Sequence, residues 1–112
     1  ETIARMKDGV TIINCARGEL MNIPDMIRGI ETQKIGALAL DVFDKEDGIY
    51  HENRRDDILS NRDMAYLRQF PNVIMTQHMA FYTDAAVQSM VFCGVEGLCD
   101  FAKTGHTATE LV

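Results

Sequence analysis

The sequence has little cysteine, no tryptophan and only two prolines among its 112 residues. Its cysteines, Cys15, Cys93 and Cys99, are odd in number and form no C-x-x-C pair, which argues against a disulfide framework and a zinc knuckle. We therefore expect free thiols that are mostly buried. The sequence also lacks an uninterrupted apolar run of about 18 to 20 residues, the length of a membrane span, and a signal-peptide layout at its start. These absences favour a cytoplasmic protein with no membrane partner.

Basic residues are scarce as well, with 11 Lys and Arg against 17 Asp and Glu, and the formal net charge is −6. The longest basic cluster is Arg54-Arg55, which acidic residues flank. Such a surface repels a phosphate backbone, so no nucleic-acid partner is expected. No metal site is expected either, because no second ligand follows His51-Glu52 at helical spacing.

The residues that are present suit a folded chain, since 46% are hydrophobic and 25% are charged. The length allows one small domain or a piece of one. The sequence opens at Glu1 without an initiator methionine, and residues 1–9 have the pattern of a short helix that stops at Gly9. We therefore expect a truncated beginning.

Strands and helices are predicted to alternate along the chain. Apolar runs rich in β-branched residues at 10–16, 35–43 and 73–76 predict strands covered on both faces. Asn22 is predicted to cap a first helix and Thr83 a last one that ends near residues 104–105, with a helical turn at 64–70 and an exposed loop at 44–63. Gly94 and Gly97 suggest close packing of another element against the last helix.

This order of elements predicts an α/β fold, namely half of a doubly wound parallel sheet. Ligands of such sheets bind beyond the carboxyl ends of the strands. Arg17, Asp41, Glu46 and His78 each lie at or just after a predicted strand end. Residues that are distant in sequence are therefore expected to converge there.

The chemistry of these side chains suits hydride transfer to a 2-oxo acid. A guanidinium such as that of Arg17 matches a carboxylate with a planar pair of donors, and an imidazole such as that of His78 exchanges protons near neutral pH. Glu46, if it contacts the far ring nitrogen of His78, would favour the protonated ring. Asp44 and Asp47 are the alternatives to Glu46 in this acidic loop.

Four blocks in order give the sequence a resemblance to a known family. They read MKDGV at 6–10, INCARGEL at 13–20, ALDVF at 39–43 and PNVIMTQHMAFYT at 71–83. Together they resemble the D-isomer-specific 2-hydroxyacid dehydrogenases, and within that family the D-lactate dehydrogenases. The resemblance implies that residues 1–83 are the C-terminal half of a Rossmann-type NAD-binding domain. Residues 84–112 would be a terminal helix and tail that pack toward a substrate (catalytic) domain.

The resemblance also implies site residues. Arg17 is similar to the family's substrate-carboxylate arginine, Glu46 to its histidine-orienting glutamate and His78 to its acid/base. Residues implied to line NAD are Cys15, Ala16, Arg17, Asp41 and His78, and those implied to line the substrate pocket are Arg17, His78 and Phe81. Phe81 resembles an aromatic wall that favours small 2-oxo acids such as pyruvate, and Tyr82 supports this subgroup more weakly.

Two departures from the family pattern stand out. Gln77 occupies a position that is usually proline, and the G-x-G-x-x-G turn with its ribose-binding acid does not occur in this sequence. The choice between NAD and NADP therefore stays open. Two alternatives to a D-lactate-type enzyme remain: an inactive half-domain that persists by dimerisation, since the family commonly forms homodimers, and a reductase for a bulkier 2-oxo acid.

Overall fold

The computed structural model describes residues 2–46, 48–50, 53 and 61–110. The chain forms two compact units, Glu1–Met79 and Ala80–Val112. Half of the loop expected at 44–63, including Asp47, His51 and Glu52, lies outside the described residues. The assignment of 1–83 and 84–112 to a nucleotide and a substrate domain stays a prediction.

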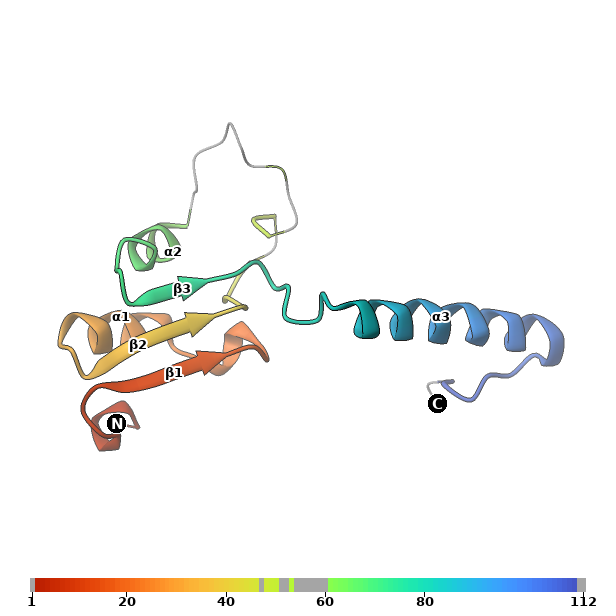
Figure 1. Ribbon diagram of the computed structural model, residues 1–112, viewed down its shortest axis with the longest axis horizontal. Helices are drawn as coiled ribbons and strands as arrows, with labels where there is room; N and C mark the ends of the chain where they lie inside the picture. The colour runs from red at the N-terminus through yellow and green to blue at the C-terminus, as the bar shows by residue number, and fades with distance from the viewer. Residues whose placement is uncertain (1, 47, 51–52, 54–60, 111–112) are drawn as a thin grey trace. The chain divides into compact units, whose positions relative to one another are not determined.

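The first unit is built on three parallel strands, β1 (Val10–Asn14), β2 (Ile35–Leu40) and β3 (Val73–Met75), in the order β1-β2-β3 (Figure 1). The last residues of the strands stand opposite one another, because Asn14 pairs with Leu40 and Leu40 with Met75. The predicted parallel α/β arrangement is therefore confirmed. The loops that follow the three strands therefore lie at the same edge of the sheet.

Two helices of this unit, α1 (Ile23–Glu31) and α2 (Arg62–Leu67), begin at asparagine caps. The side-chain oxygen of Asn22 accepts the Asp25 N–H, and that of Asn61 accepts the Met64 N–H, each at 3.0 Å. The first cap was predicted, whereas α2 begins two residues earlier than the predicted turn because Asn61 caps it. Two short 3₁₀ helices, η1 (Ile3–Arg5) and η2 (Gly18–Leu20), flank β1.

The core of the first unit lies between the sheet and these two helices. Its buried members come from α1, β2 and α2 and from the residues just after β2, and they are Ile23, Met26, Ile30, Ile35, Leu38, Leu40, Phe43, Met64 and Leu67. The opposite face carries Ile13 and Ile74, which are about two-thirds exposed. Among the described residues of this unit, α1 and α2 cover one face of the sheet only, so the expectation of strands covered on both faces is wrong for this part of the chain.

The second unit is dominated by α3 (Asp84–Thr104), which Thr83 caps through Ala86 N–H and which ends at Gly105 with φ of 75°. None of its residues is buried, so Cys93 and Cys99 are exposed, as is Cys15. The expectation of mostly buried thiols is wrong. Gly97 faces Thr107 and Thr109, whereas nothing lies within 4 Å of a Cβ built at Gly94, although close packing was expected at both.

By length and composition alone, α3 could cross a membrane. This is weak evidence, because core helices of soluble proteins meet the same criterion. The mean hydropathy of an 18-residue window detects this helix as a candidate span, whereas a search for an uninterrupted apolar run does not. The expectation of no membrane partner stays a prediction.

The loop after β1 packs on the backbone that follows β2, and this contact can be tested at Gly18. A Cβ at Gly18 would collide with backbone atoms of Phe43 and Asp44, which cannot rotate away. We expect Gly18→Ala to lower the free energy of unfolding by about 1–3 kcal/mol. Urea denaturation followed by circular dichroism measures this.

Gly94→Ala is the matched control, because its new methyl group meets open space on a helix. It should leave the unfolding of the sheet unit unchanged and add helix stability of about 1 kcal/mol. Equal stability of the Gly18→Ala variant and the unaltered chain would contradict the close packing of the two loops.

Candidate active site

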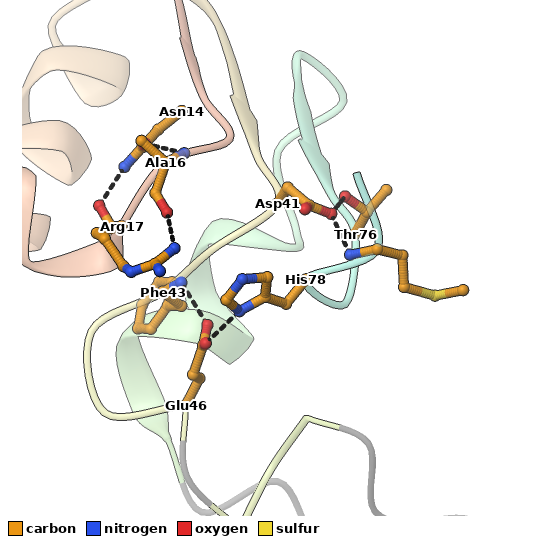
Figure 2. Close-up of polar contacts among 9 residues, drawn as sticks. Asn14, Ala16, Arg17, Asp41, Phe43, Glu46, Thr76 and His78 are labelled. Atoms are coloured by element: carbon orange, nitrogen blue, oxygen red, sulfur yellow. Dashed lines mark hydrogen bonds and ion pairs between the residues drawn. The ribbon is translucent and has the colours of Figure 1, made fainter. Parts of the chain in front are cut away.

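Polar side chains from the three loops after β1, β2 and β3 gather at the carboxyl edge of the sheet (Figure 2). Arg17 follows β1, Asp41 and Glu46 follow β2, and His78 follows β3. All four belong to the first compact unit. The structure therefore brings together the residues that the strand-end argument selected.

The loop after β1 is folded around the buried side chain of Asn14. The side-chain oxygen of Asn14 accepts the Ala16 N–H at 3.0 Å, and its Nδ2 donates to the Arg17 carbonyl at 2.8 Å. This local bonding by an asparagine turns the chain sharply after the strand. Cys15, Ala16 and Arg17 are exposed as a result.

The guanidinium of Arg17 stays available for an anion. Its Nη1 donates to the neighbouring Ala16 carbonyl at 2.8 Å. Among the described residues Arg17 forms no ion pair with a carboxylate. An exposed arginine whose charge no internal acid neutralises can bind a substrate carboxylate through its remaining donors.

Asp41 joins the end of β2 to both neighbouring loops and is 4% exposed. Its Oδ1 accepts the Thr76 hydroxyl at 2.5 Å and the Met79 N–H at 2.8 Å. Its carbonyl accepts the His78 N–H at 2.6 Å, and its own N–H donates to the Asn14 carbonyl at 3.0 Å. Side chain and backbone of one residue thus fix the loop that carries His78.

His78 adopts a left-handed backbone conformation, with φ of 55°. For a residue other than glycine this conformation costs roughly 1–2 kcal/mol, so surrounding contacts must enforce it. The bonds from Asp41 to the N–H groups of residues 78 and 79 supply that constraint. Gln33 and Lys45 share this conformation, with φ of 59° and 58°, and His78 is the one of the three at the candidate acid/base position.

The His78 ring contacts the glutamate that the sequence singled out. Nδ1 of His78 lies 2.5 Å from Oε1 of Glu46, and Oε2 of Glu46 accepts the Phe43 N–H at 3.0 Å. Both side chains are partly buried, with 32% of His78 and 24% of Glu46 exposed. Because an ionised carboxylate only accepts, Nδ1 carries the proton that faces Glu46.

The structure therefore contains the predicted contact between Glu46 and His78, although the catalytic roles stay predictions. Phe81 and Tyr82 lie in the second unit, where their rings make an edge contact at 6.1 Å between centroids. Their part in a substrate pocket stays a prediction. No group of three metal-ligating side chains occurs among the described residues.

Sequence reasoning did not assign roles to Asn14 and Thr76, and it gave Asp41 a cofactor role only. All three are bracing residues of the loops described above. The signal was present for Asn14, because asparagine at a strand end commonly forms such a turn. The bond between Thr76 and Asp41 links residues 35 apart in sequence, and no local pattern reveals it.

Comparison with known proteins agrees with this geometry. Residues 1–80 match the model of the D-isomer specific 2-hydroxyacid dehydrogenase, NAD binding domain. The chain is 44% identical over its whole length to the aromatic 2-oxoacid reductase of Clostridium sporogenes, of which it covers 34%. It thus spans about a third of the length of the curated relatives that it matches.

Solved structures show the same likeness. The chain superposes on a D-lactate dehydrogenase from Treponema pallidum with a TM-score of 0.90 and 31% identity, covering 99% of this chain and 34% of that one. For a D-lactate dehydrogenase from Aquifex aeolicus complexed with NAD and lactic acid the TM-score is 0.78 at 30% identity, covering 98% and 35%. The chain belongs to the D-isomer specific 2-hydroxyacid dehydrogenase family, and its residues 1–80 match the family's NAD-binding domain.

Proposed function

We propose that this chain forms part of an NAD-dependent oxidoreductase that interconverts a small 2-oxo acid and the corresponding D-2-hydroxy acid. The observation that carries the proposal is the 2.5 Å contact between Glu46 and His78, at the same sheet edge as Arg17, which pairs with no carboxylate in the described part of the chain. A base oriented by an acid and a cation for a carboxylate are the two functions that such a substrate requires.

Arg17 orients the substrate in this proposal. Its planar guanidinium donates two parallel hydrogen bonds to the substrate carboxylate, which fixes the direction of the adjacent carbonyl group. Asn14 already holds the loop of Arg17, so less conformational entropy is lost when the substrate binds. Positioning of this kind lowers the barrier before any bond changes.

His78 transfers the proton. In reduction, Nε2 of the protonated ring gives its proton to the carbonyl oxygen as that oxygen becomes a hydroxyl, and solvent restores the proton afterwards. Glu46 holds Nδ1–H throughout and stabilises the charged ring. In oxidation the same nitrogen accepts the proton of the substrate hydroxyl.

The edge of the sheet suits NAD, because the exposed residues Cys15 and Ala16 form a turn beyond β1 where a ligand can approach the backbone. The residues proposed to hold the cofactor are Cys15, Ala16, Arg17, Asp41 and His78. When bound, NADH supplies the hydride that reduces the keto carbon.

A chimera tests this function. The chain replaces the matching 112 residues of the Clostridium sporogenes reductase, with which it is 44% identical. We expect NADH-dependent reduction of 2-oxo acids, and we expect His78→Asn to lower kcat by roughly 10²–10⁴-fold because the proton donor is lost. NADH absorbance measures the rate.

His106→Asn is the matched control, because His106 also contacts a glutamate, with Nδ1 3.2 Å from Oε2 of Glu110, but lies in the C-terminal tail. It should leave kcat unchanged. Retained turnover in the His78→Asn chimera would remove His78 from the mechanism and with it the proposed function.

Arg17→Lys tests the carboxylate clamp. Lysine keeps the charge but not the planar pair of donors, so we expect kcat/KM for the 2-oxo acid to fall by roughly 10–100-fold, the equivalent of one charged hydrogen bond. Arg28→Lys is the control, because Arg28 is exposed on α1 and pairs with Asp25. Equal losses of kcat/KM in the two variants would show that Arg17 does not bind the substrate carboxylate.

A bulkier substrate is the second candidate, favoured by the 44% identity to a relative named as an aromatic 2-oxoacid reductase. Phe81, as an aromatic wall, favours the small substrate. The ratio of kcat/KM for pyruvate to that for phenylpyruvate separates the two candidates. The ratio should be measured with this chain grafted into an aromatic reductase and into a D-lactate dehydrogenase.

An inactive half-domain that persists by dimerisation is a candidate of another class. It is favoured by large apolar side chains that α3 exposes, among them Phe92, Leu98 and Phe101. Light scattering after size exclusion tests it, since a soluble, folded monomer would contradict obligatory pairing.

For the oxidoreductase, we further propose that the complete enzyme is a homodimer in the cytoplasm, with no nucleic-acid or membrane partner.

A further inference from the structure

Tyr50 and Glu46 belong to the same short turn after β2. The N–H groups of Ile49 and Tyr50 both donate to the Glu46 carbonyl, at 2.9 and 3.1 Å. A chain that closes one helical turn in this way places the side chains of its first and fifth residues on the same side. The phenol of Tyr50 is therefore carried by the backbone that presents Glu46 to His78.

The hydroxyl of Tyr50 is buried and has no hydrogen-bond partner within the described part of the chain. Its ring packs against the core of the first unit, so the side chain is fixed. A buried polar group without a partner costs about 1–3 kcal/mol, and tyrosine hydroxyls in proteins usually find one. Pure core packing would be served equally well by phenylalanine.

Charged groups from the loop after β2 and from the end of α2 act on this hydroxyl. Burial raises the pKa of the Tyr50 phenol above its ordinary value, Glu46 and Asp41 raise it further, and Arg68 at the end of α2 opposes them. The phenol is therefore protonated at neutral pH and can donate. Glu46 can accept, because a carboxylate has about four lone-pair sites and its contacts with His78 and with the Phe43 N–H occupy two.

We propose that Tyr50 is a positioning residue for the Glu46–His78 pair, with its hydroxyl donating through one bridging water to the Glu46 carboxylate. A water between the two side chains would accept from the Tyr50 phenol and donate to the Glu46 carboxylate. The contact adds a third constraint on the rotation of the carboxylate, beside the Phe43 N–H and the His78 ring. Its consequence for turnover rests on the proposed function.

Tyr50→Phe in the chimera removes the hydroxyl and keeps the ring. We expect kcat to fall by about 3–10-fold, the equivalent of one net hydrogen bond, with KM for the 2-oxo acid unchanged. Tyr66→Phe is the matched control, because the Tyr66 hydroxyl bonds Oε1 of Glu31 at 2.9 Å on the α2 side. If the two variants have equal kcat while His78→Asn still lowers turnover, the inference about Tyr50 is wrong and the proposed function is unaffected.

A second measurement needs no activity. In the 112-residue chain with ¹³C-labelled tyrosine, Glu46→Gln should lower the pKa of Tyr50, because it removes one of the two carboxylates that raise it. Tyr66 should titrate as before, and Tyr50→Phe assigns the resonance. An unchanged pKa of Tyr50 would show that the two side chains do not interact and would overturn the inference. If the wild-type chimera shows no turnover, the proposed function fails and this titration still decides whether Tyr50 and Glu46 interact.

Discussion

The carboxylate of Asp41 is the constraint on which the site depends. It stands at the end of the central strand and binds the Thr76 hydroxyl and the Met79 N–H, while its backbone bonds Asn14 and His78. Few side chains of this unit are both polar and buried, and burial makes such bonds strong and their loss costly. One residue thus ties the ends of three parallel strands into one rigid edge.

The acid/base pair is built on that edge rather than on the loops alone. His78 is held in a left-handed conformation that a histidine would otherwise leave, and this conformation belongs to the geometry that places Nδ1 beside Glu46. Glu46 in turn is held by the backbone of Phe43, which packs against the loop that carries Arg17 through Gly18. The cation and the acid/base of the proposed reaction therefore share one frame.

Much of this could be predicted from sequence, because the signals are local. Asparagine and threonine caps, β-branched runs and the Gly105 stop predicted the strands and α-helices to within three residues, whereas the helix expected at 1–9 is a 3₁₀ turn at Ile3–Arg5. Polar strand ends selected Arg17, Asp41, Glu46 and His78. The bracing of Asp41 by Thr76 was missed because it joins distant segments, and the buried phenol of Tyr50 was missed because no sequence pattern says what covers a side chain. Burial was misjudged at the three cysteines and on one sheet face, because apolar character does not say what covers a residue.

The central claim is that this chain by itself assembles the oriented histidine. The most direct test is ¹⁵N NMR of the His78 ring in the folded 112-residue chain, alone and with Asp41→Ala. We expect a proton on Nδ1 in the unaltered chain, and ring nitrogens that average between tautomers once the bonds from Asp41 are lost. The same tautomer in both proteins, or a proton on Nε2 in the unaltered chain, would contradict it.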